Sequence, residues 1–170
     1  MTTLERRHGK ERELRRVPVV LSNGEDITFL LGRQNVLVKK VIADFCSFYS
    51  PGGHVIYVSG TKAKWSYLDS DALADLGLAI EVYEKMPDIV VHHLEKNCLS
   101  LIEAVPGHGP ISSKHRQELK ELFAGSKAGI IYVTAFLYRR AMIKYFDEIS
   151  WETEALVCRI PDAPHAFKWQ

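Results

Sequence analysis

The chain has 170 residues, of which 46% are hydrophobic and 25% are charged, and its formal net charge at pH 7 is +1. This length suffices for one domain with a sizeable core, and the composition is that of an ordinary globular protein. The balanced charge excludes binding to nucleic acid through overall charge alone, so such binding would rest on local basic patches. Three cysteines without C-x-x-C spacing argue against a disulfide framework or a zinc site, and no apolar run reaches membrane-spanning length. We therefore expect a cytoplasmic protein with reduced thiols and no membrane partner.

The start of the chain is predicted to form a charged arm followed by a hairpin. Residues 1–16 are mostly charged, and a solvated tail is favoured over a basic arm that contacts phosphates. The apolar runs 17–21 and 27–31 flank Asn23 and Gly24, a pair that is typical of hairpin turns. These runs predict two antiparallel strands.

A helix, a strand and a second helix are predicted next. Apolar side chains recur at helical spacing at Leu37, Val41, Phe45 and Phe48. Asn35 stands before them as a candidate N-cap, so we predict an amphipathic helix through this run. An apolar run at 54–58 predicts a strand. The following short helix is capped by Asp69 or Ser70 and ends at Gly77.

The second half of the chain alternates apolar runs with helical segments. Strands are predicted at 89–91, 98–105, 129–134 and 154–158, and helices at 112–123 and 138–149. A hairpin followed by helix-linked strands makes a mixed central sheet with helices on its faces. The expected fold class is therefore α/β.

Two carboxylates stand where strand cores are normally apolar. Asp88 begins the run at 89–91, and Glu103 interrupts the run at 98–105. Burying an unpaired carboxylate is costly, so we expect each to have a partner, which could be a cation, a metal ion or a hydrogen-bond donor. On paired strands the two could converge, and such a pair suits a divalent metal ion that activates water for phosphoryl chemistry. A simpler interpretation of Asp88 is that it caps the turn after Pro87.

In this order of elements, the pair resembles the metal site of the PD-(D/E)xK nuclease superfamily. More closely, the chain resembles the catalytic region of BsuBI/PstI-type restriction endonucleases over about residues 17–154. The matching motifs include KMPDIVV at 85–91, LIEAV at 101–105, GPI at 109–111, VTAF at 133–136 and WETE at 151–154. Several motifs in the right order make this resemblance more specific than a lone Pro-Asp pair.

The resemblance implies a Mg²⁺-dependent type II endonuclease that cuts both strands of a short palindromic site in double-stranded DNA, usually as a homodimer. It implies that Asp88 and Glu103 hold the metal ion with the main-chain carbonyl of Ala104. The fold would be a PD-(D/E)xK nuclease-like core with a mixed central sheet. An alternative from a different class is a catalytically inactive DNA-binding or structural remnant of such an enzyme.

The superfamily normally completes this site with a lysine two residues after the second acid, where this chain has Val105. The BsuBI/PstI-type family also reads Glu-Ala-Val there, so we expect a displaced cation. Lys64 is the first choice for this catalytic role because it matches a position of the family, and Lys85 and Lys114 are alternatives. For each lysine, a solvated surface side chain is the simpler interpretation.

Candidate DNA contacts lie beyond Glu103. His108 stands in the loop that follows, close enough to reach a phosphate. Residues 112–116 open a predicted helix, and helix N-termini with basic side chains bind phosphate readily. Lys114 and Arg116 are therefore candidate DNA-binding residues, although capping and solvation explain the same residue types.

Two segments depart from the family pattern. Gly60 replaces an acid that the family has after its first core strand. Residues 155–170 lack the family's His-x-x-His-x-Asn-Gly ending, and codons allowed for 158–170 yield that ending when shifted by one base. We therefore expect an arm at 1–16, a nuclease-like domain at 17–154 and an atypical tail at 155–170. A one-base frameshift near codon 155 is our hypothesis for the tail, and the gene sequence tests it.

Overall fold

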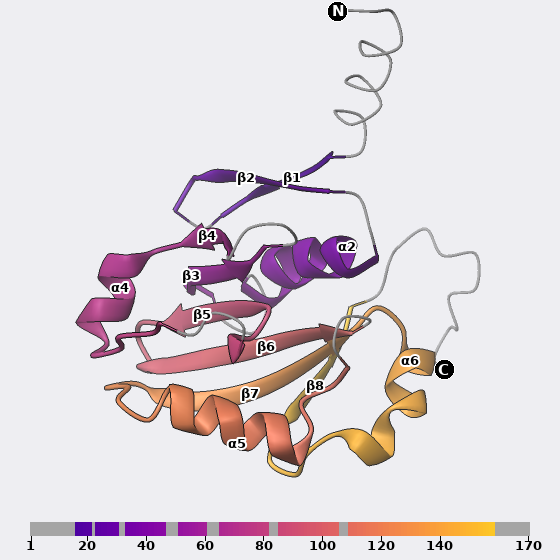
Figure 1. Ribbon diagram of the computed structural model, residues 1–170. Coiled ribbons are helices and arrows are strands. Elements are labelled where there is room, and N and C mark those ends of the chain that lie inside the picture. Colours follow the sequence, from indigo (N-terminus) through magenta and orange to yellow (C-terminus); the bar gives the residue numbers. More distant parts are fainter. Residues whose placement is uncertain are drawn as a thin grey trace, which may run out of the picture.

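The computed structural model of the protein has a central mixed sheet with helices on both faces (Figure 1). It describes residues 16–21, 23–30, 33–46, 51–60, 65–81, 85–105 and 109–158. The strands in these ranges are β1 (Arg16–Val20), β2 (Asp26–Leu30), β3 (His54–Ser59), β4 (Trp65–Leu68), β5 (Ile89–His93), β6 (Cys98–Val105), β7 (Gly129–Phe136) and β8 (Glu154–Val157). The α-helices are α2 (Arg33–Lys40), α4 (Ser70–Asp75), α5 (Ser113–Leu122) and α6 (Arg139–Lys144), with a π-helical turn η1 (Val41–Phe45) and a 3-10 turn η3 (Phe146–Glu148).

Within the described part of the chain, the large sheet has the order β4-β3-β5-β6-β7-β8, and β1 and β2 form a separate hairpin. The first four strands of the large sheet pair antiparallel, whereas β6 pairs parallel with β7, and β7 parallel with β8. The mixed sheet predicted from the chain order is therefore confirmed. Strands β5 and β6 lie at its centre, where both faces must be covered.

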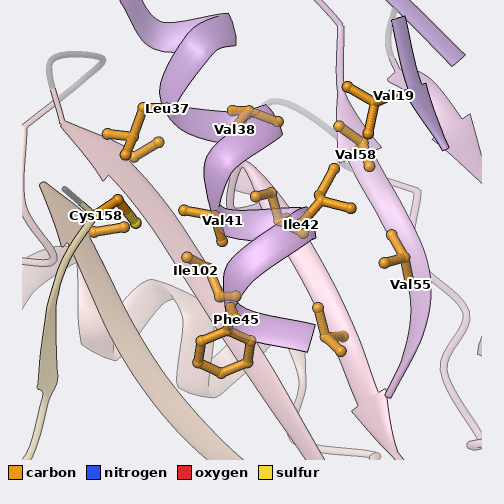
Figure 2. Packing of buried hydrophobic residues seen from close by; sticks show 14 of the residues in the cluster. Val19, Leu37, Val38, Val41, Ile42, Phe45, Val55, Val58, Ile102 and Cys158 are labelled. Carbon is orange, nitrogen blue, oxygen red and sulfur yellow. The ribbon is translucent and has the colours of Figure 1, made fainter. Parts of the chain in front are cut away.

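One face of the sheet is covered by the continuous helix of α2 and η1 (Figure 1). Figure 2 shows Leu37, Val41 and Phe45 projecting from this helix onto the sheet, where Ile102 of β6 lies beneath them. The predicted apolar stripe is thus the buried face of the helix. The apolar side chains of this helix pack against one face of the sheet and form one hydrophobic cluster with it.

The opposite face is covered by α4 and α5. Leu119 and Phe123 of the α5 segment, together with Leu73 of α4, pack there with strand side chains that include Leu99 and Leu101. Side chains alternate along β6, because Ile102 and Ala104 belong to the cluster under α2. Any side chain that shares the parity of Leu99 and Leu101 therefore lies on the α5 side.

A bulge in β3 interrupts this alternation at one point. Val55 pairs with Val91, but Tyr57 pairs with Val90, so one extra residue stands opposite β5 between these pairs. Val55 and Val58 consequently face the α2 side although they are an odd number of positions apart. The bulge therefore sets which way the end of β3 points.

Most predicted elements are confirmed, with small changes at their ends. The hairpin around Asn23 and the predicted strands are present, and of the two cap candidates Asp69 and Ser70, Asp69 is the N-cap of α4. Asn35 is not an N-cap, because the helix starts at Arg33, before it, and the side chain of Asn35 is 9% exposed. The helix predicted at 138–149 is shorter, with α6 followed by the 3-10 turn η3, and β4 was not predicted.

Both ends of the chain lie outside the described residues. Phe48, residues 1–15 and residues 159–170 lie outside the described residues, so the arm and most of the tail stay predictions. The first residues of the predicted tail form β8 against β7, and Cys158 beside them is 4% exposed. No helix among the described residues is long and apolar enough to cross a membrane.

Candidate active site

Asp88 lies immediately before β5 and accepts hydrogen bonds from β3 and β6. The hydroxyl of Ser59 donates to Oδ1 over 3.1 Å, and the main-chain N–H of Ala104 donates to Oδ2 over 2.8 Å. The N–H of Ser59 also donates to the main-chain carbonyl of Asp88 over 2.8 Å. The carboxylate is 4% exposed, yet it has the hydrogen-bond donors that a buried charge requires. The structure thus gives Asp88 partners beyond a simple turn cap.

Glu103 lies near the end of β6, and its side chain is 3% exposed. By the alternation of β6 it faces the α5 side, and Asp88 faces the same side because it shares the parity of Val90. Burial raises the pKa of Glu103 well above its usual range, and the charge of Asp88 and a hydrogen bond with that carboxyl raise it further. The predicted convergence of the two acids is therefore present.

His115 is the third group at this end of the sheet. Its Nε2 lies 3.3 Å from Oε1 of Glu103, and its side chain is 23% exposed. It stands in the first turn of α5, where the hydroxyl of the N-cap Ser112 accepts a hydrogen bond from its main-chain N–H. The site is thus built from the ends of β3, β5 and β6 and the start of α5.

The two carboxylates have the chemistry of a divalent-metal site. Burial, and after it the charge of Asp88, raises the pKa of Glu103. The two carboxylates repel each other when both are ionised, and a shared cation relieves that repulsion. Mg²⁺ is commonly held by one or two carboxylates, with water and phosphate oxygens completing its shell. Among the described residues no set of three or more His, Cys, Asp and Glu side chains has metal-binding geometry. Asp88 and Glu103 are thus a protein ligand set of the kind that Mg²⁺ accepts.

The three lysine candidates are either exposed or outside the described residues. Lys64 and His108 lie outside the described residues. Lys85 and Lys114 are both exposed, on a turn before Asp88 and on the first turn of α5. Val105, at the position of the superfamily lysine, is buried.

Arg116 is engaged within the protein. Its guanidinium donates from Nη2 to Oε2 of Glu152 over 2.7 Å and stacks 4.9 Å from the ring centre of Tyr132. The side chain is 27% exposed. A contact between Arg116 and DNA would compete with the pair to Glu152.

Two site residues were absent from the predicted set. Ser59 precedes Gly60 and contacts Asp88 only because of the way β3 and β5 pair. His115 was recognised only as part of a polar helix start, between Lys114 and Arg116. A signal for both existed in the order of elements, since each stands at the end or start of an element that borders the acids.

The fold and the paired carboxylates define a restriction endonuclease-like domain. A model of the BsuBI/PstI restriction endonuclease domain matches residues 17–168. The chain therefore belongs to the BsuBI/PstI restriction endonuclease family.

The relatives and the solved structure are named as restriction enzymes. The chain is 44% identical to the type II restriction enzyme BsuBI of Bacillus subtilis, over 94% of this chain and 50% of that protein. It is 27% identical to the type II restriction enzyme AplI of Arthrospira platensis, over 94% of this chain and 51% of that protein. The structure of the SdaI restriction endonuclease matches with a TM-score of 0.81 and 33% identity, over 93% of this chain and 50% of that chain. The chain thus spans about half the length of these proteins.

Proposed function

We propose that this chain carries the catalytic site of a type II restriction endonuclease, which hydrolyses phosphodiester bonds at a short palindromic site in double-stranded DNA with Mg²⁺ as cofactor. The observation that carries the proposal is the pair of buried carboxylates, Asp88 and Glu103, brought together on one face of a restriction endonuclease-like fold. Family membership supports the choice of DNA as the substrate.

The residues of the site have separable roles in this proposal. Asp88 and Glu103 bind the metal ion, with the carbonyl of Ala104 as a further ligand. When bound, the divalent cation supplies charge neutralisation at the scissile phosphate and lowers the pKa of a water molecule. Ser59 and the N–H of Ala104 keep the Asp88 carboxylate oriented through their hydrogen bonds. Lys64 is the proposed additional cation, and His108, Lys114 and Arg116 are proposed DNA contacts.

Two active sites related by twofold symmetry match the two equivalent strands of a palindrome, so we propose a homodimer on DNA. Sedimentation with and without a cleavable duplex measures this directly. A cytoplasmic location fits a DNA substrate and the three cysteines Cys46, Cys98 and Cys158, all of which are free thiols.

A plasmid-cleavage assay tests the proposal. We expect discrete fragments in Mg²⁺, none in EDTA, and none from the variants Asp88→Asn and Glu103→Gln. Mapping the fragment ends identifies the recognised sequence. Fragments that persist in both variants would show that these carboxylates are not the catalytic pair.

Two observations favour the catalytically inactive alternative. Val105 leaves no cation at the usual position, and Gly60 stands where the family has an acid. Under this alternative the parent chain retards duplex DNA in a gel-shift experiment but cuts no plasmid in Mg²⁺ or Mn²⁺. The same pair of assays therefore separates the two functions.

A further inference from the structure

The position of the superfamily lysine is filled by an apolar side chain. Val105 stands two residues after Glu103 on the same strand, so both side chains lie on the same face of the sheet. Val105 is 2% exposed, and its side chain carries no charge. A group that serves Glu103 must therefore come from another element.

Helix α5 brings such a group to Glu103 from outside the sheet. Nε2 of His115 lies 3.3 Å from Oε1 of Glu103, which is within ion-pair distance. The carboxylate is 3% exposed and the imidazole 23%, so the contact is made at the inner edge of the site, where solvent screens it little. Asp88 is the other charged group beside this carboxylate.

The start of α5 is fixed to the same strands as Glu103. Ser112 caps the helix, with its hydroxyl 3.2 Å from the N–H of His115. Just before it, the N–H of Ile111 donates to the hydroxyl of Thr134 over 3.1 Å. Thr134 is the partner of Glu103 in the register of β6 and β7. The paired residues Glu103 and Thr134 therefore fix the position of the helix turn that carries His115 relative to the carboxylate.

We propose that His115 is a positioning residue, which donates a hydrogen bond from Nε2 to Oε1 of Glu103 and thereby orients this carboxylate for the metal ion. The inference rests on the proposed function and deepens it. A carboxylate held through one oxygen presents the other in a defined direction, which is how hydrogen-bond partners of metal ligands raise metal affinity.

Binding of Mn²⁺ in the absence of DNA tests this role without relying on cleavage. Isothermal titration calorimetry on the parent chain, His115→Ala and His115→Gln measures the dissociation constant. We expect His115→Ala to weaken binding about tenfold to a hundredfold. In His115→Gln the side-chain amide can donate from a similar position, so binding should return to within about threefold of the parent.

His92→Ala is the matched control, because His92 is a partly buried histidine on β5 that contacts Asn97 at the far end of the strand. It should bind Mn²⁺ like the parent. Thermal unfolding in EDTA is measured for every variant. If His115 were merely structural, both His115→Ala and His115→Gln would lower the melting temperature, and His115→Gln would not restore Mn²⁺ binding.

The outcomes distinguish this inference from the proposed function. If Asp88→Asn abolishes Mn²⁺ binding while His115→Ala leaves it unchanged, the positioning role is wrong and the metal site stands. A loss in His115→Ala that His115→Gln does not restore also overturns it. If the parent chain binds no Mn²⁺, the inference is overturned, and plasmid cleavage by the same preparation decides whether the proposed function fails with it.

Discussion

The two ends of the β5–β6 hairpin show opposite ways of handling polar groups. At the turn end, residues 94–97 are exposed, and the N–H of Lys96 donates to Nδ1 of His93 over 3.2 Å. Asn97 donates from its amide to the carbonyl of Lys127 over 3.2 Å. At the other end, Asp88 and Glu103 are almost completely buried and face each other.

The difference separates what folding needs from what chemistry needs. The turn end satisfies its polar groups locally or with water, as a stable hairpin should. The carboxylate end buries two acidic groups, and both burial and mutual repulsion oppose the ionisation of Glu103. Buried carboxylates that cost stability at one end of the hairpin support the proposal that this end carries the chemistry.

The largest effect is expected when the carboxylate end loses a charge. Glu103→Gln should lower the cleavage rate in Mg²⁺ about a thousandfold or more, because metal stabilisation of charge contributes several kcal/mol. Glu95→Gln makes the same chemical change on the exposed turn and should leave the rate unchanged. Single-turnover cleavage of a labelled duplex measures both. Equal losses in the two variants would remove the contrast between the two ends.

The pH dependence of stability should also differ between the two ends. The folded pKa of Glu103 lies above its ordinary value of 4.5. At pH values between the unfolded and folded pKa, the native state keeps a proton that the unfolded state has lost, so the free energy of unfolding falls as pH rises through this window. Without divalent metal, Glu103→Gln should therefore be more stable than the parent at neutral pH.

That advantage should shrink as the pH is lowered toward 4.5, where the unfolded state also holds the proton. Thermal unfolding in EDTA across this range measures it, with Glu95→Gln as the control at the turn end. A constant difference at all pH values would mean that Gln packs better, and that repulsion plays no part.

A smaller effect is expected from the hydrogen bond that orients Asp88. Ser59→Ala removes the donor to Oδ1, and a bond of this kind contributes about 1 kcal/mol or somewhat more, which corresponds to about a tenfold loss of cleavage rate. Ser126→Ala removes a hydroxyl that bonds to the main chain at Ala128, away from the acids, and should not change cleavage. Urea unfolding of both variants shows whether stability accounts for the difference.

The smallest effect is expected at the turn itself. Asn97 has φ of 46°, a left-handed conformation that asparagine tolerates better than alanine. Asn97→Ala should lower the free energy of unfolding by about 1 kcal/mol, since it adds strain. Urea denaturation measures this change, and the cleavage rate without urea should equal that of the parent chain. A large loss of cleavage would show that the two ends are coupled through the strands.

The elements that sequence reasoning found are those that local chemistry specifies. Asp69 and Ser112 have side chains suited to helix caps and do cap α4 and α5. Asn35 has the same preference but lies inside the helix, which starts at Arg33. Strand β4 has four residues and pairs only with β3, so its sequence carries too little periodic signal to predict it.

The site was predictable in part for a related reason. Asp88 and Glu103 stand out because a carboxylate inside an apolar strand violates a local rule. His115 violates no such rule, since a histidine at a helix start is ordinary. Its contact with Glu103 depends on where α5 crosses the sheet, which follows from the parallel pairing of β6 with β7.

The bulge in β3 gives the active site a dependence on chain length. Along an uninterrupted strand, Ser59 would share the face of Val55, which lies under α2 and away from Asp88. The extra residue in the bulge shifts the alternation of side chains by one, so Ser59 points to the other face and its hydroxyl reaches the Asp88 carboxylate. A single-residue deletion between Val55 and Tyr57 could therefore leave the strand paired while turning Ser59 to the wrong side. For this part of the protein, insertions and deletions are a more severe kind of change than substitutions.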